Sequence, residues 1–226
     1  VNIMENEHIV GKFDDDLDRI KNEILEMGKL VRKQIQGATN ALLSFDTDDV
    51  DTLVATDRRI NGMNKTIHRH AEQIIAMRQP MALDLRLALM ATSIANELER
   101  LGDHAKSTAK KVRKLTENSS GEKTMKLIGQ MSEIVQEMLT GVLTAYKNND
   151  IEKAAEIRVR DADVDSLNKE IQKTAIKAIP EFPEDTETLV HLILLARNFE
   201  RAGDHIVNIA RQVHQIVTGE DLKASS

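Results

Sequence analysis

The residues best suited to chemistry in this chain are acids that recur in a fixed pattern. Glu99 and Asp103 are four residues apart, and Glu200 and Asp204 repeat that pair 101 residues later. Both pairs lie in a stretch of the form Glu-Arg-x-Gly-Asp-His, and the two stretches agree at five of six positions. On a helix this spacing puts both carboxylates on one face, with Cβ atoms roughly 5–6 Å apart. Because like charges at that spacing are destabilising, the repeated pattern indicates a site that holds a cation.

Further acids interrupt the apolar face of an earlier helical segment in each half of the chain. Asp57 and Asp161 occupy positions where the helical period calls for an apolar residue, and Asp165 lies one turn after Asp161, where the first half has Asn61. Unpaired buried carboxylates are very costly, so we expect these acids to meet cations or water. Neighbouring antiparallel helices would gather two sets of acids: Asp57, Glu99 and Asp103 in the first half, and Asp161, Asp165, Glu200 and Asp204 in the second.

Sites rich in carboxylates and free of sulfur favour hard metals such as magnesium, calcium or manganese, and also hold iron or zinc through bridging oxygens. We therefore predict metal ligands at these seven acids. His104 and His205 each follow an acid directly, so their side chains turn about 100° away around the helix and are not expected to be ligands. The other five histidines (His8, His68, His70, His191 and His214) are expected at the surface or at helix ends.

Gly102 and Gly203 lie inside the two motifs, in the middle of predicted helices. A glycine there costs about 1 kcal/mol relative to alanine. That cost is tolerable where another backbone or a ligand approaches closely, so both glycines support a crowded site.

Two other interpretations of the acids compete with a metal site. In the first, arginines neutralise the acids and the protein is a metal-free helical scaffold; the arginines are Arg86, Arg100, Arg197 and Arg201. In the second, the protein is a carboxylate-bridged di-iron enzyme, a class that needs a Glu-x-x-His pair from each of two helices. The chain offers only Glu5 and His8 in that pattern. Since no nucleophile lies beside an activating base, we expect no enzymatic activity.

The segments that must position these acids are helical. Apolar residues spaced by threes and fours predict long helices over residues 13–45, 50–78, 83–115, 125–146, 154–178 and 189–217. The second three repeat the plan of the first three. We predict an all-α fold of two tandem, pseudo-symmetric three-helix bundles with six long antiparallel helices. Their predicted ranges are residues 8–117 and 122–219, joined at the polar stretch 118–121.

Composition narrows the functional classes. The net charge of −6 argues against a protein that binds nucleic-acid backbones. The absence of cysteine excludes disulfides, thiolate zinc sites and iron–sulfur clusters, and is compatible with the cytoplasm. No apolar run reaches the length of a membrane span, and no signal peptide is evident at the start.

At the repeated acids the chain resembles the PhoU family of phosphate-signalling regulators. The resemblance rests on the two Glu-Arg-x-Gly-Asp stretches, the pair Asp161 and Asp165, and the segment 78–86, which is similar to the family's RQP-x-x-x-DLR pattern. The opening of the first helix is also similar, and the likeness extends over about residues 9–219. Asn61 departs from the family pattern, so the first site has one carboxylate fewer. The second half has no clean match to the DLR segment, because residues 184–186 read Glu-Asp-Thr.

This resemblance implies a cytoplasmic, non-enzymatic protein that acts as a negative regulator of phosphate signalling and uptake. The implied partners are the ATPase subunit of the phosphate ABC transporter and the phosphate sensor histidine kinase. The family also implies metal ions at the repeated acids (iron, zinc, manganese or magnesium), held in multinuclear clusters, and a homodimer. It implies no nucleic-acid partner and at most a peripheral association with the membrane.

Overall fold

The computed structural model describes the backbone of residues 3–115 and 120–220, and the side chains from residue 15 onward except at position 78. Within these ranges the chain forms six long α-helices and no β-strand. The helices are α1 (Ile3–Ser44), α2 (Val50–Arg78), α3 (Ala82–Val112), α4 (Glu122–Asn148), α5 (Ile151–Ala178) and α6 (Thr186–Thr218), with a short 3-10 helix, η1 (Pro183–Asp185), before α6. The predicted all-α architecture of two three-helix halves is confirmed.

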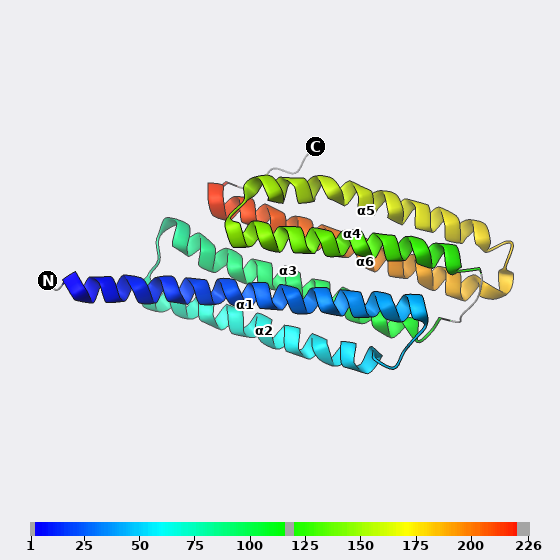
Figure 1. Cartoon of the computed structure of the whole chain (residues 1–226), viewed down its shortest axis with the longest axis horizontal. Helices are drawn as coiled ribbons and strands as arrows, with labels where there is room; N and C mark the ends of the chain where they lie inside the picture. The colour runs from blue at the N-terminus through cyan, green and yellow to red at the C-terminus, as the bar shows by residue number, and fades with distance from the viewer. Residues whose placement is uncertain (1–2, 116–119, 221–226) are drawn as a thin grey trace.

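The two halves lie side by side along the long axis of the molecule (Figure 1). Helices α1 and α4 are in contact, and so are α3 and α6, which makes a central group of four helices. Helix α2 packs on α1 and α3 at one edge, and α5 packs on α4 and α6 at the other. Within the described part of the chain, α2 and α5 therefore contact only helices of their own half.

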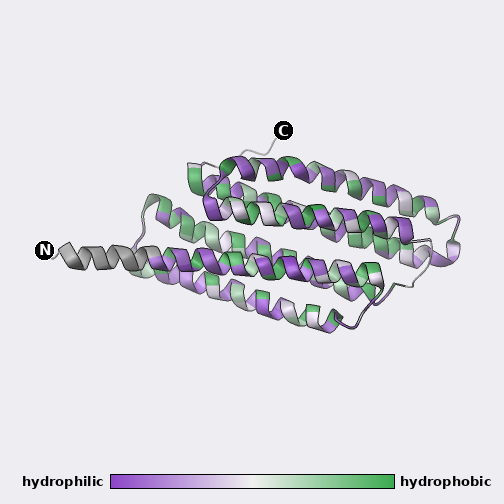
Figure 2. Ribbon diagram, viewed as in Figure 1, coloured by the Kyte–Doolittle hydropathy of each residue, from purple (hydrophilic) through white to green (hydrophobic). Residues whose placement is uncertain are grey.

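One hydrophobic core runs through both halves. Hydrophobic and hydrophilic residues alternate along each helix (Figure 2), as expected for helices that bury one face and expose the other. The core contains fully buried side chains from the first half, such as Ile24 and Leu98, and from the second half, such as Met131 and Leu192. Each side chain of this size contributes about 1.5–3 kcal/mol when it leaves water. The same burial that forms each bundle therefore also joins the two bundles.

Local signals end the helices close to the predicted boundaries. Helix α2 stops before Pro80, with Gln79 in the left-handed region at φ 49°. The side chain of Asp150 accepts a hydrogen bond from the Lys153 amide at 2.9 Å and so caps the start of α5. Gly219, at φ 75°, ends α6. Helix α1 begins at Ile3, ten residues before the apolar pattern starts at Phe13.

The predicted linker falls partly outside the described residues, since positions 118 and 119 are among those not described. The division of the chain at residues 8–117 and 122–219 stays a prediction. None of the helices that the described residues form combines the length and the apolar character that a membrane span requires.

Candidate metal centre

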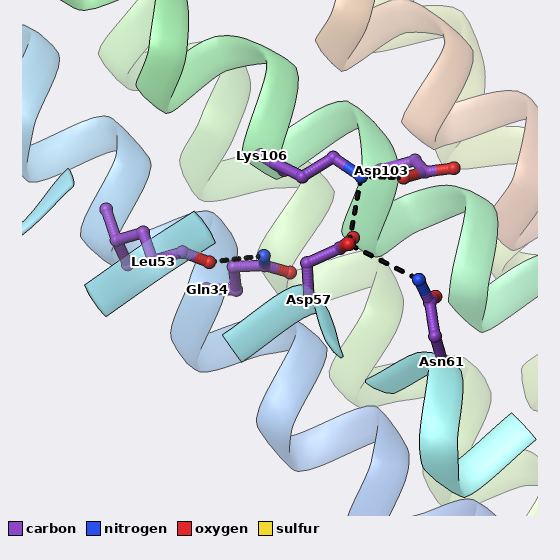
Figure 3. Close-up of polar contacts among 6 residues, drawn as sticks. All are labelled: Gln34, Leu53, Asp57, Asn61, Asp103 and Lys106. Atoms are coloured by element: carbon purple, nitrogen blue, oxygen red, sulfur yellow. Dashed lines mark hydrogen bonds and ion pairs between the residues drawn. The ribbon is translucent and has the colours of Figure 1, made fainter. Parts of the chain in front are cut away.

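The first acidic cluster lies between α2 and α3 and contains a lysine. Asp57 projects from α2 and is only 5% exposed, whereas Asp103 projects from α3 and is partly exposed. The Lys106 ammonium donates to Asp57 Oδ2 at 2.9 Å and to Asp103 Oδ1 at 2.5 Å (Figure 3). Acids from two helices thus meet here as predicted, but they meet around an internal cation that the sequence analysis did not single out.

Polar groups continue from this cluster into the core. The Asn61 amide donates to Asp57 Oδ2 at 3.3 Å, so that one oxygen receives hydrogen bonds from both Asn61 and Lys106 (Figure 3). Gln34 is almost fully buried, and its amide nitrogen donates to the Leu53 carbonyl at 2.9 Å. Asp57 Oδ1 and Gln34 Oε1 are buried and have no hydrogen-bond partner among the described residues. The first half therefore has a buried polar region as well as an acidic rim.

The electrostatics of the first cluster reflect this lysine. Burial raises the pKa of Glu99, and the charges of Asp103 and Asp57 raise it further, so Glu99 belongs to the same cluster. Burial alone would lower the pKa of the Lys106 ammonium, but the hydrogen bonds and charges of Asp103 and Asp57 raise it overall. The lysine is therefore held in its charged form and offsets part of the negative charge around it.

The second cluster, between α5 and α6, gathers the four acids predicted for that half. Burial raises the pKa of Asp161 to about 6, and the charges of Asp165, Asp204 and Glu200 add to the effect in that order. Asp161 is half-buried, whereas Asp165 and Asp204 are exposed, so this cluster opens to solvent. The acidic neighbours of Asp161 thus add to the effect of its burial, and the charge of Arg211 opposes it.

In the part of the chain that the structure describes, no lysine forms an ion pair with these four acids. The position equivalent to Lys106 is Val207, 101 residues later. Arg197 forms a long ion pair with Glu200: its Nη1 lies 3.8 Å from Glu200 Oε1, at the far limit of such a contact. Glu200 Oε2 is buried and has no hydrogen-bond partner among the described residues. Arginine charges also act on this cluster, since Arg211 lowers the pKa of Asp161 and Arg197 and Arg201 lower that of Glu200, so the arginine-neutralised scaffold keeps some support.

Gly203 explains how α6 comes so close to Asp161 of α5 in the second cluster. A Cβ atom at Gly203 would lie 2.6 Å from Asp161 Oδ1, which is closer than real Cβ atoms approach an oxygen. At Gly102 a Cβ would lie 3.1 Å from Ile60 Cδ1 and 3.2 Å from Gln34 Oε1, a tight but less severe contact. Both motif glycines therefore mark a close approach, and in the second half the approaching group is a carboxylate.

The two clusters differ in how well they suit a metal ion. Among the described residues, no three acidic or histidine side chains converge closely enough to enclose one, so ligation requires the carboxylates to rotate. The second cluster has four mutually repelling carboxylates, an unpartnered oxygen on Glu200 and access from solvent, and this donor set fits a hard divalent cation. The first cluster does not fit, because Lys106 already holds Asp57 and Asp103.

The two motif histidines turn away from the acids, as expected. The rings of His104 and His205 stack on each other where α3 meets α6, with centroids 5.3 Å apart. His205 Nδ1 lies 2.7 Å from Glu97 Oε2, which links the two halves. Burial of Glu97 works to raise its pKa, but the hydrogen bond to His205 and that residue's charge lower it overall. At His104, burial and the charges of His205 and Arg201 outweigh the opposing charge of Asp103 and lower the pKa to about 4.

Sequence reasoning missed several residues of this region. Lys106 follows Asp103 by three positions. It becomes noticeable only when the two halves are compared residue by residue, because the second half has valine at the equivalent position. Glu97 gave no signal, because the second half has Asn198 at that position. The expectation that His70 lies at the surface or at a helix end is wrong: it is buried, and its Nδ1 lies 2.8 Å from Glu23 Oε2. The side chains of Glu5 and His8, the pair considered for a di-iron enzyme, lie outside those described.

The architecture and the repeated acids define a duplicated helical-bundle protein, and comparison with known proteins identifies its family. The family model of the PhoU domain matches twice, over residues 24–112 and 128–213. The chain belongs to the PhoU family. It is 35% identical over 216 residues to the "Phosphate-specific transport system accessory protein PhoU homolog" of Caulobacter vibrioides, a match that covers 96% of this chain and 94% of the relative.

Solved structures agree with this assignment. The crystal structure of PhoU from Pseudomonas aeruginosa matches with a TM-score of 0.85 and 32% identity, covering 92% of this chain and all of the other. The crystal structure of the phosphate transport system regulatory protein PhoU from Streptococcus pneumoniae matches with a TM-score of 0.87 and 27% identity, covering 94% of this chain and all of the other. The likeness therefore includes both halves and their arrangement.

Proposed function

We propose that this protein is a non-catalytic regulator of phosphate uptake that links the phosphate ABC transporter to a sensor histidine kinase. The observation that carries the proposal is the match of both halves to the PhoU domain. Support also comes from relatives whose names describe accessory or regulatory proteins of phosphate transport. In this role the protein contacts the ATPase subunit of the transporter and the kinase on the cytoplasmic side of the membrane. It lowers the phosphate-starvation response when phosphate is plentiful, and it works as a homodimer.

Metal binding at the second cluster is part of the proposal. The four acids there repel one another, as the raised pKa of Asp161 indicates, and a divalent ion such as iron, zinc, manganese or magnesium would neutralise them. Asp161 and Asp165 project from α5 and Glu200 and Asp204 from α6, so an ion held by these four residues fixes the edge helix against a central one. The role of the metal is thus structural and regulatory rather than catalytic.

Deleting the gene in its source organism tests the regulatory role. We expect phosphate-scavenging genes to be expressed even in phosphate-rich medium, and the wild-type gene to restore repression. Affinity capture of the tagged protein, with and without the transporter ATPase and the kinase co-expressed, tests the two partners. Normal repression in the deletion strain, with no retention of either partner, would contradict the proposal.

A metal-free adaptor is the second candidate function, and Lys106 favours it because an amine already neutralises one of the two clusters. Elemental analysis of protein purified without chelators separates the two candidates. Retention of metal by the wild type and its loss in Asp204→Asn supports the metal-binding adaptor. Metal-free protein that also fails to take up Mn²⁺ on reconstitution supports the alternative.

A further inference from the structure

The two halves differ at one position that decides how the acids are neutralised. Helices α3 and α6 carry the same motif at an offset of 101, which places Lys106 opposite Val207 in the comparison of the halves. The offset is constant through the motif, because Gly102 and Gly203, and likewise Asp103 and Asp204, are also 101 residues apart. The difference is therefore a real substitution at an equivalent place in the fold.

Lys106 occupies the point between the helices where a shared cation would have to lie. Its Nζ is 2.9 Å from Asp57 Oδ2 on α2 and 2.5 Å from Asp103 Oδ1 on α3, so a single positive charge bridges the two helices (Figure 3). The lysine side chain is 24% exposed and that of Asp57 only 7%, so the Asp57 contact is largely shielded from water. Ion pairs shielded in this way are screened by salt much less than exposed ones.

A metal ion at the first cluster would have to displace this lysine. The Asp57 oxygen that faces α3 already accepts hydrogen bonds from both Lys106 and Asn61. Asn61 directs its amide nitrogen at the same Asp57 oxygen, and its own Oδ1 is buried without a hydrogen-bond partner among the described residues. Expelling the lysine would also leave an ammonium close to the incoming ion, and like charges repel.

We propose that Lys106 is the resident cation of the first cluster, that this cluster takes no metal ion, and that metal in the protein is confined to the second cluster, where the position equivalent to Lys106 is Val207. The part that concerns the second cluster rests on the metal-binding role proposed above. The part that concerns Lys106 rests only on contacts within the first half. On this proposal the two clusters differ in the source of their positive charge, which is a lysine side chain in the first and a bound metal ion in the second.

Mn²⁺ titration of the full-length protein, followed by calorimetry and by the EPR signal of free Mn²⁺, tests the proposal. In the wild-type background we expect Asp103→Asn to leave the number of bound ions unchanged and Asp204→Asn to lower it. Lys106→Met is expected to bind additional Mn²⁺, and a second change, Asp57→Asn, is expected to abolish that gain. Lys110→Met, an exposed lysine of the same helix, is the matched control and should bind as the wild type does.

The reciprocal substitution, Val207→Lys, places an amine beside the second cluster. We expect it to weaken Mn²⁺ binding there by roughly 10–100-fold, the range seen when groups around a metal site are altered. Circular dichroism confirms that each variant is folded. If Lys106→Met is unfolded without metal, the wild-type comparison of Asp103→Asn with Asp204→Asn still decides the question.

The outcomes separate this inference from the proposed function. A fall in bound Mn²⁺ on Asp103→Asn, or a folded Lys106→Met that gains no ion, overturns the inference while leaving metal at the second cluster intact. Wild-type protein that binds no Mn²⁺, together with a Lys106→Met variant that does, overturns the proposed metal site and supports the role of Lys106.

Discussion

The two acidic clusters have the same backbone design and a different charge balance. In each, an edge helix and a central helix bring acids together, and a motif glycine allows close approach. The first cluster contains Lys106 between Asp57 and Asp103, whereas the second holds Asp161 at a pKa raised to about 6 by burial and by its acidic neighbours. The comparison shows that a duplicated fold can keep its backbone geometry while the exchange of a lysine for a valine changes the charge of the site.

The largest expected effect comes from removing the lysine of the first cluster. Lys106→Met leaves the buried Asp57 carboxylate without its ammonium, and an uncompensated buried charge costs about 3–5 kcal/mol. Because Lys106 is partly exposed, we expect a loss near the lower end, about 3 kcal/mol, in the free energy of unfolding. Urea unfolding of metal-free protein measures it.

The matched change for that prediction is Val207→Lys, which adds a cation beside the second cluster. Val207 is buried in the hydrophobic core, so its lost apolar contacts oppose the gain from the added charge, and we expect this variant to lose less unfolding free energy than Lys106→Met. A neutral Lys106→Met would remove the basis of the comparison.

The contact between the halves provides the second prediction. Glu97→Gln removes the charged partner of His205, and a hydrogen bond to a charged group contributes about 1.5–3 kcal/mol when well shielded. We expect a loss of about 1–2 kcal/mol, measured by thermal and urea unfolding near neutral pH. The pKa of Glu97 is lowered in the fold, so its contribution is present above its ordinary pKa and disappears as the pH falls through the lowered value.

The equivalent position in the second half offers the control for Glu97. Asn198 donates to Thr108 Oγ1 at 3.2 Å, a contact between neutral groups. Asn198→Ala should therefore cost about 1 kcal/mol with no dependence on acid pH. A pH-independent loss in Glu97→Gln would show that its charge plays no part.

The motif glycines give a third and smaller contrast. Gly102→Ala places a methyl group against Ile60 and Gln34 in the core. We expect the resulting strain to be slightly larger than the gain of about 1 kcal/mol in helix propensity, so the variant should be slightly less stable than the wild type. In Gly203→Ala the Asp161 carboxylate can turn towards solvent, so we expect little change in unfolding but weaker Mn²⁺ binding. Unfolding and Mn²⁺ titration of the pair check this. Equal Mn²⁺ affinity in both variants would contradict it.

The smallest effect concerns pH. Since the pKa of Asp161 is raised in the fold above its ordinary 3.8, the folded state binds more protons than the unfolded state between about pH 4 and 6. The stability of metal-free protein should therefore fall as the pH rises through that window. Asp161→Asn should remove this trend and be more stable than the wild type at pH 7, whereas Asp57→Asn should be less stable because it loses Lys106. Unfolding with chelator present, from pH 4 to 7.5, measures both.

Much of the fold could be predicted because helix periodicity is a property of local sequence. The apolar spacing located all six helices, and Pro80 marked a boundary within a residue or two. The late start predicted for α1 shows the limit of the method, because residues 3–12 are helical without contributing to the apolar pattern that begins at Phe13.

The charge balance of the sites was harder to predict, because it depends on contacts across helices. The acids stood out by their repetition, but Lys106 has no repeated partner and resembles any surface lysine in the sequence. The pairs of His70 with Glu23 and of His205 with Glu97 join residues 47 and 108 positions apart, a separation that no helical pattern reveals. Lys106 can be found in the sequence by aligning the two halves and looking for the positions at which they differ.

The peripheral placement of α2 and α5 has a mechanical consequence. Each can loosen from the four central helices without opening the interface between the halves. Lys106 ties α2 to α3 through Asp57, whereas on the proposed metal site α5 would be held by an ion that can bind and dissociate. The molecule thus has a fixed edge and an adjustable edge, and in metal-free protein the amides of α5 should exchange with deuterium sooner than those of α2.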